Sequence, residues 1–440
     1  MSMIVLLVIL FIFILIGVPV GFAIGGATMI AIATTSNLNM VVNAQYCYSG
    51  IFSFTVMAIP FFMLAGIIMS TGGIAKKIVN FCEALIGSVT GALGCVSMLA
   101  CMFFGALSGS GMATTSAIGS MLIPEMRQKG YPADYAATLV CFGGIVGPII
   151  PPSLSFVLYG SATGVSIATL FKAGIFPGIM LGLGFMFMNI FFCKKYGYGR
   201  VAVNEVDAAM AKSAFHHRMQ NLWKATKEGF WALLSPVIIL GGIYSGIFTP
   251  TEAACVSVVY SLIISFFVYR DLDLHGIYKT FVDAAVLNGI TSFLLGYSTV
   301  FSTFMTFMKV PNDIYNFLMS VSSSKYVMLL IINVILLIMG CFMNMVSIVY
   351  IMTPILLPIV QRLGMHPVQF GIMMILNLGI GLLTPPVGQV LFVGCSVGDI
   401  SMEKLSKALL PQMAFMVLAL VLVTFIPAIT MWLPHLAGYV

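Results

Sequence analysis

Long hydrophobic runs make up most of the chain, and short groups of basic residues separate them. A run of about 20 apolar residues is long enough for a helix to cross a bilayer. Runs of this kind predict membrane-crossing helices over 3–33, 50–72, 133–165, 173–193, 230–248, 252–270, 281–308, 367–394 and 408–433. The pattern therefore predicts an all-α polytopic membrane protein.

Two further apolar segments, 92–127 and 329–361, carry small or polar residues at their centres. These centres read LSGSGMATTS at 107–116 and CFMNMVS at 341–347. A backbone turn at membrane depth is tolerated only where it is buried in protein or lines a watery cavity. We therefore predict that each segment is a re-entrant helical hairpin whose two arms meet at a polar tip.

Composition and charge support this class and give a topology. Hydrophobic residues make up 60% of the 440 positions and charged residues only 7%, whereas a soluble protein averages about 25% charged. If the N-terminus is cytoplasmic and both hairpins return to their side of entry, only Lys172, Lys309, Lys325 and Arg362 of the 19 Lys and Arg residues lie outside. This obeys the positive-inside rule and predicts a periplasmic C-terminus. Lys309, Lys325 and Arg362 either dock a periplasmic partner or are ordinary interfacial charges.

The two halves of the chain resemble each other at an offset of 234 positions. This shift aligns Pro124 with Pro358, Gly130 with Gly364, Gly147 with Gly381, Pro151 with Pro385, Pro152 with Pro386, Gly160 with Gly394, Gly164 with Gly398, Pro177 with Pro411 and Ser110 with Asn344. The predicted topology opens the two hairpins to opposite sides, so the repeats are inverted. Inverted repeats with paired hairpins and paired discontinuous helices are typical of secondary transporters, whose site lies near the midplane.

Glycine and proline interrupt two predicted helices, at GGIVGPIIPPS (143–153) and NLGIGLLTPPVGQ (377–389). In a helix interior each proline costs about 3 kcal/mol and each glycine about 1 kcal/mol relative to alanine. The interruptions are expected to free carbonyls for a hard cation such as Na⁺ and to aim helix N-termini at a carboxylate. Alternatively, the same residues only allow a kink and close helix packing. The matched interruptions and tips together favour a binding site.

The acidic residues favour Na⁺ over H⁺ as the coupling ion. All 13 are expected near helix ends or in loops, with Asp134 and Asp283 as candidates for deeper positions. No buried carboxylate chain is then available to relay protons. The nine cysteines include no C-x-x-C pair, so neither a cofactor nor a metal other than Na⁺ is predicted.

Several blocks in order resemble the large membrane (M) subunit of tripartite ATP-independent periplasmic (TRAP) transporters, over nearly the whole chain. They include IPFFMLAGIIMSTGG (59–73), FGALSGSGMATTSAIGSMLIPEM (104–126), GGIVGPIIPPS (143–153), SGIFTPTEA (245–253), TPILLP (353–358) and GIGLLTPPVG (379–388). One departure lies at the second tip, where similar proteins often carry an acidic residue and this chain reads FMNMVS.

The resemblance implies Na⁺-driven import of an organic acid across a bacterial inner membrane, by an elevator mechanism and without enzymatic activity. C4-dicarboxylates, sialic acid, sugar acids and keto acids all fit. The implied partners are a small four-helix membrane subunit, expected as a separate chain, and a periplasmic substrate-binding protein.

The resemblance also implies a division of the chain and a set of site residues. Scaffold helices would occupy 1–79, 166–193, 230–314 and 395–440, the transport domain 80–165 and 315–394, and a cytoplasmic linker 194–229. One Na⁺ would lie at Ser108, Ser110, Gly143 and Gly147, and another at Asn344, Ser347, Gly381 and Thr384. Substrate would lie between the tips, near Thr114, Thr115, Pro151, Pro152, Pro385 and Pro386.

Three other classes remain open. A divalent-anion/Na⁺ symporter or an arsenite-type permease would share the hairpins and need no binding protein. An intramembrane protease is suggested by Gly398–Asp399, which resembles half of a di-aspartate site but lacks a second intramembrane Asp. A permease of a primary pump would need a cytoplasmic ATPase, for which the 194–230 segment shows no evident feature.

Overall fold

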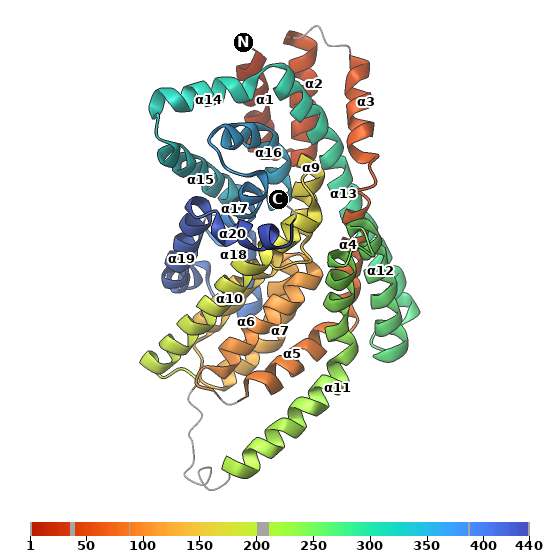
Figure 1. Ribbon diagram of the computed structural model, residues 1–440, viewed down its shortest axis with the longest axis vertical. Helices are drawn as coiled ribbons and strands as arrows, with labels where there is room; N and C mark the ends of the chain where they lie inside the picture. Colours follow the sequence, from red (N-terminus) through yellow and green to blue (C-terminus); the bar gives the residue numbers. More distant parts are fainter. Residues whose placement is uncertain (1, 36–39, 88, 200–210, 386–387, 439–440) are drawn as a thin grey trace.

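The computed structural model describes residues 2–35, 40–87, 89–199, 211–385 and 388–438, and every regular element in these ranges is helical. The helices form an elongated bundle (Figure 1). By length and apolar composition, six of them can cross a membrane, or up to eight if each of two bent pairs counts as one span. This agrees with the predicted class of polytopic membrane protein.

The first apolar run forms two helices that fold back on each other. α1 (Ser2–Leu15) is followed by a turn at Gly17, where φ is 84°, and the N–H of Val18 donates to the carbonyl of Phe13 at 3.0 Å. In the following α2 (Val20–Thr35), Gly26 packs against the Phe13 ring. The single crossing predicted over 3–33 is therefore wrong. One helix of that length would span about 46 Å, well beyond the roughly 30 Å of a bilayer core.

The predicted crossing over 50–72 is shorter than expected and is followed by a sharp bend. α3 (Met40–Ile51) leads to α4 (Ala58–Thr71), and α5 (Ile74–Ile86) turns away from α4 by 67°. Gly73 makes this bend possible because its φ is 76°, a left-handed conformation that glycine adopts without strain. The sequence predicted neither α3 nor α5.

Two hairpins and two interrupted helices form the centre of the molecule. The hairpins are α6 (Ala92–Ser108) with α7 (Gly111–Gln128), and α15 (Lys325–Phe342) with α16 (Met345–Arg362). The first interrupted helix consists of α8 (Ala133–Val146), the 3-10 turn η1 (Gly147–Ile149) and α9 (Leu154–Thr163), with a bend of 41°. The second consists of α17 (Pro367–Gly381) and α18 (Gln389–Gly398).

Each hairpin touches an interrupted helix through a pair of glycines. A methyl group at Gly105 would lie 2.3 Å from the Cα of Gly147, and one at Gly381 would lie 2.5 Å from the Cα of Gly340. Backbone therefore meets backbone at both places. The second half of each interrupted helix packs on the other hairpin, α9 on α16 and α18 on α7.

The remaining helices form two groups. α10 (Ile167–Tyr196) and α19 (Met402–Phe425) pack mainly on the hairpins and interrupted helices, together with α20 (Ala428–Leu436). α12 (Pro250–Ile263, extended by a π-helical turn to Val268) packs on α4, and α13 (Leu274–Phe307) packs on α2, α3 and α4. α14 (Val310–Val321), which the sequence did not predict, connects α13 to α15.

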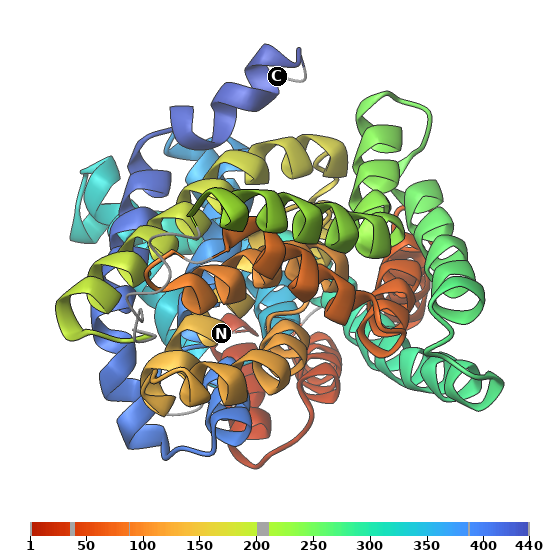
Figure 2. The same cartoon turned by 90° about the horizontal axis from the view of Figure 1, so that it is seen from below.

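Beyond residue 210, the segment after α10 is helical. α11 (Ala211–Tyr244) joins most of the predicted linker to the next crossing in one helix, and it packs on α5. In the view from below, these two helices run side by side across the end of the molecule (Figure 2).

We expect Gly105→Ala to destabilise the protein, because its methyl group would meet the backbone of Gly147 rather than a movable side chain. Overpacking of this kind costs about 1–3 kcal/mol. Gly241→Ala in α11 is the control, since a methyl group there meets nothing within 4 Å. Thermal unfolding of the purified chain should show a lower midpoint for Gly105→Ala only. An unchanged midpoint for Gly105→Ala would contradict the tight contact.

Candidate functional site

The tip of the first hairpin is a small cluster of hydroxyl groups. Ser110 is the N-cap of α7, and its Oγ accepts a hydrogen bond from the N–H of Ala113 at 3.3 Å. Ser108 Oγ and Thr114 Oγ1 lie 3.0 Å apart, and Thr114 Oγ1 donates to the carbonyl of Ser110 at 2.9 Å. The fold thus brings three predicted site residues, Ser108, Ser110 and Thr114, into one cluster.

The first tip lies on the start of α9, directly after the first interruption. A methyl group at Gly109, the turn residue with a φ of 63°, would lie 2.6 Å from the Cβ of Leu154. Ser153 is the N-cap of α9, and its Oγ also donates to the carbonyl of Pro148 within the interruption. The interruption is therefore a hydrogen-bonded turn that supports the tip.

The second tip is held by an amide that the sequence reasoning missed. Asn344 is the N-cap of α16, where its Oδ1 accepts from the N–H of Val346 at 2.8 Å, and its Nδ2 donates to Gln389 Oε1 at 3.4 Å. Gln389 is the first residue of α18, so this bond links the tip to the far side of the second interruption. The offset of 234 pairs Gln389 with Ser155, whose Oγ lies 3.2 Å from Met345 Sδ on the same tip, but only the fold reveals either contact.

Three glycine carbonyls in the interruptions already accept hydrogen bonds. The carbonyl of Gly143 accepts from the N–H of Gly147, that of Gly147 from Ile150 at 3.0 Å, and that of Gly381 from Thr384 at 3.0 Å. The expectation that the interruptions leave these carbonyls without partners is therefore wrong, because the chain forms tight turns there. A carbonyl oxygen keeps a second lone pair, so Na⁺ binding by these residues stays a prediction.

Both tips open on one cavity of about 870 Å³, which we call the tip cavity. It lies between the hairpins and helices α2, α4 and α13. Its polar side chains are Ser70, Ser108, Ser110, Thr291, Asn344 and Ser347, and most of the remaining lining is apolar. Among the described residues that line it, none is charged. The volume is in the range of small-molecule sites, about 300–1,000 Å³.

The other predicted site residues lie behind this surface. Those outside the lining are Thr114, Thr115, Gly143, Gly147, Pro151, Pro152, Gly381, Thr384 and Pro385. Thr114 and Thr115 are fully buried, while Thr384 is half-buried and donates to the carbonyl of Ile380 at 2.8 Å. Pro386 lies outside the described residues. Their assignment to Na⁺ or substrate stays a prediction.

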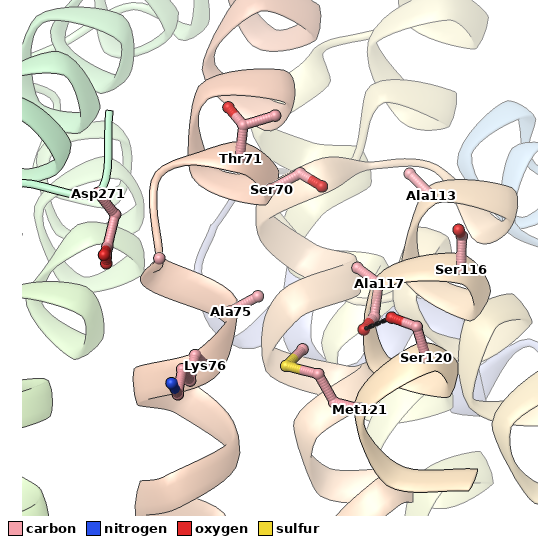
Figure 3. Close-up of a pocket in the computed structure, with 11 residues that line it drawn as sticks. Ser70, Thr71, Ala75, Lys76, Ala113, Ser116, Ala117, Ser120, Met121 and Asp271 are labelled. Carbon is pink, nitrogen blue, oxygen red and sulfur yellow. Dashed lines mark hydrogen bonds between the residues drawn. The ribbon is translucent and has the colours of Figure 1, made fainter. Parts of the chain in front are cut away.

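A second cavity, which we call the vestibule, adjoins the tip cavity. It measures about 540 Å³ and lies between the α4–α5 bend, α7 and the connection from α12 to α13. Figure 3 shows Ser116, Ala117 and Ser120 on α7 across from the bend. Unlike the tip cavity, the vestibule has charged residues in its lining, Lys76 and Asp271. The sequence reasoning did not identify either as a site residue.

The acidic residues singled out from the sequence lie away from both cavities. Asp399 is exposed at the end of α18 with a φ of 50°, and it lines neither cavity. Asp134 and Asp283 also lie outside both linings. The described part of the chain therefore shows no pair of aspartates suited to proteolysis at either cavity.

Comparisons with known proteins point to one family. The family model for the DctM component of the tripartite ATP-independent periplasmic transporters matches residues 7–429. The isethionate TRAP transporter permease protein DctMQ of Oleidesulfovibrio alaskensis is 41% identical over 420 residues, which cover 96% of this chain and 64% of that protein. The sialic acid TRAP transporter large permease protein SiaM of Vibrio cholerae is 37% identical, with 96% of both chains covered. The C4-dicarboxylate TRAP transporter large permease protein DctM of Rhodobacter capsulatus is 36% identical over the full length of both.

Two solved structures share the fold at low sequence identity. The YdaH transporter of Alcanivorax borkumensis gives a TM-score of 0.64 at 12% identity, covering 88% of this chain and 89% of its own. The Neisseria gonorrhoeae protein MtrF gives a TM-score of 0.55 at 13% identity, covering 88% and 83%.

We expect Asn344→Ala to destabilise the second hairpin, because it removes both the N-cap of α16 and the bond to Gln389. Loss of an N-cap costs about 0.5–2 kcal/mol. Gln389→Ala should lower the stability of the protein by less, since the N-cap of α16 remains. A double-mutant cycle by thermal unfolding separates the two effects, and strictly additive losses would show that the amide pair contributes nothing.

Proposed function

Because the chain belongs to the DctM component family of tripartite ATP-independent periplasmic transporters, we propose that it imports an organic acid as the large permease of such a transporter. The family comprises transporter permeases rather than enzymes. The chain is a multi-pass membrane protein, which we place in a bacterial inner membrane. The observation that carries the proposal within this molecule is the convergence of both hairpin tips on one cavity of about 870 Å³.

The substrates named for the relatives indicate a class of substrate for this chain. They specify isethionate, sialic acid and C4-dicarboxylates, which are one sulfonate and two kinds of carboxylate. These acids differ in size and in number of charges, but each is an anion at neutral pH. We therefore propose an anionic organic acid, delivered by a periplasmic binding protein to this chain and a small membrane subunit.

The tip cavity can attract an anion without any cationic side chain in its described lining. α7 begins at the first tip and α16 at the second, so two helix N-termini meet the cavity. A helix N-terminus carries about half a positive charge and has backbone N–H groups that lack intrahelical partners. Bound cations would add the remaining positive charge, which gives a physical reason for coupling to Na⁺.

We place one Na⁺ near each tip. The donors available are neutral oxygens, from Ser108 and Ser110 at the first tip and from Asn344, Ser347 and Gln389 at the second. The carbonyls of Gly147 and Gly381 lie behind the tips and keep one lone pair each. Hard monovalent cations suit such ligands.

The packing of the helices supports an elevator movement with a revised division of the chain. We propose that α6–α10 and α15–α20 move as one body against α1–α5 and α11–α13. This assigns 166–193 and 395–440 to the moving body, because α10 and α19 pack mainly on the hairpins and interrupted helices. The end that carries α5, α11 and the end of α10 (Figure 1) is rich in Lys and Arg, so we place it in the cytoplasm.

Uptake into proteoliposomes tests the proposal. With the small subunit inside the membrane and the cognate binding protein added outside, we expect a Na⁺ gradient to drive uptake of radiolabelled succinate, N-acetylneuraminate or isethionate. Ser347→Ala should raise the Na⁺ concentration for half-maximal uptake about tenfold, since losing one polar contact to a charged group costs about 1.5 kcal/mol. Ser320→Ala on the exposed face of α14 is the control and should leave it unchanged.

Other outcomes would refute parts of the proposal. Uptake without a binding protein would assign the chain to stand-alone symporters, and uptake driven only by a proton gradient would exclude Na⁺ coupling. An unchanged Na⁺ requirement in Ser347→Ala would remove that hydroxyl from the proposed cation site.

A further inference from the structure

The vestibule continues the tip cavity along α7. Ser70 and Ala113 line both cavities, so the two spaces meet there. From Ala113 the vestibule follows Ser116, Ala117 and Ser120, which lie along α7, across from the α4–α5 bend (Figure 3). Seven residues of helix correspond to about 10 Å. The vestibule therefore leads from the tips towards the end of the molecule that we place in the cytoplasm.

The chemistry of the lining changes along this path. The tip cavity has no charged residue in its described lining, whereas the vestibule is lined by Lys76 and by the hydroxyl groups of Ser70, Thr71, Ser116 and Ser120. The hydroxyl groups of Ser70 and Ser116 make no hydrogen bond to other described residues, so they are available to a ligand. These are the donors that a carboxylate or a sulfonate requires.

The charge of Lys76 is not neutralised by an ion pair within the described structure. The adjacent Lys77, by contrast, lies 3.3 Å from Glu228. Asp271, the acidic residue of the vestibule, packs against Gly73 at the start of α5, where a methyl group would lie 1.8 Å from its Oδ2. That position favours a negative charge because the helix N-terminus is partly positive.

We propose that the vestibule is a second anion site, in which the transported carboxylate or sulfonate binds beside Lys76 after it leaves the tip cavity. The inference rests on the proposed function, since it names a site on the exit path of the same substrate. Lys76 attracts the anion out of the uncharged tip cavity. Asp271 repels it and keeps the affinity low, so that the anion is released into the cytoplasm instead of being retained.

The two charges therefore predict opposite effects in the transport assay. Because the binding protein is added outside, only chains whose periplasmic face points outward take up substrate. The same acid, unlabelled and preloaded inside, then inhibits uptake from the cytoplasmic face of these chains. Lys76→Gln should raise the internal concentration of unlabelled acid that half-inhibits uptake, by about three- to tenfold. Asp271→Asn should lower this concentration by a similar factor. Lys76→Arg should behave as the unsubstituted chain, and so should the matched control Lys77→Gln.

A labelling experiment tests the same site without transport. Ser116→Cys places a thiol in the vestibule, and Ser320→Cys on α14 corrects for the intrinsic reactivity of each reagent. After subtraction of labelling of the native cysteines, Ser116→Cys should react faster with sulfonatoethyl than with trimethylammonioethyl methanethiosulfonate. Lys76→Gln should remove this preference. Succinate or isethionate at millimolar concentration should slow the labelling of Ser116→Cys only when Lys76 is retained.

The results separate failure of this inference from failure of the proposed function. No uptake by the unsubstituted chain would refute the function and leave the labelling result to decide the site. Uptake with unchanged half-inhibition in Lys76→Gln, or effects of the same sign in Lys76→Gln and Asp271→Asn, would overturn the inference. An effect that requires phosphatidylglycerol in the liposomes would assign the anion site to lipid headgroups instead, and would also overturn it.

Discussion

The structure depends on one constraint, which is that backbone N–H and C=O groups in apolar surroundings need hydrogen-bond partners. The chain turns within its apolar interior at two hairpin tips and two interruptions. Ser110, Ser153 and Asn344 cap helices that begin at these turns, and tight turns satisfy the glycine carbonyls. A cap satisfies only part of the four N–H groups that a helix start leaves open. The starts of α7 and α16, which leave the remaining N–H groups open, both line the tip cavity.

In the function that we propose, the two cavities have different electrostatic roles, because only the vestibule has charged residues in its described lining. A site without charged side chains can hold an anion only while helix ends and bound cations supply positive charge, so its affinity depends on the ions present. A site with a lysine and an aspartate attracts an anion independently of bound cations, but weakly. Placed in series, the first suits capture against a gradient and the second suits release. Ser70 and Ala113, whose side chains are small, line both cavities.

The sequence predicted the tips and interruptions because glycine, proline and small polar residues are clustered there and recur at an offset of 234 positions. It failed at Gly17 because IGVPVG lies inside a continuous apolar run, where hydropathy alone does not report a reversal. α5 and α14 were missed since their charged or polar faces broke the apolar pattern. Lys76 and Gln389 could not be assigned from the sequence, because Lys76 shares a cavity with α7 and Gln389 bonds to Asn344 only in the folded chain.

The crossed packing of α9 on α16 and α18 on α7 ties the two hairpins into a closed ring. Each hairpin is also fixed to its nearest interruption by glycine backbones, Gly105 on Gly147 and Gly340 on Gly381, so that neither tip can swing open alone without breaking contacts on both sides of the ring. This closed packing fits the elevator movement that we propose, in which the whole ring moves past α2, α4 and α13. In that movement the ligands supplied by the two tips would stay together, and only the part of the lining supplied by α2, α4 and α13 would be exchanged.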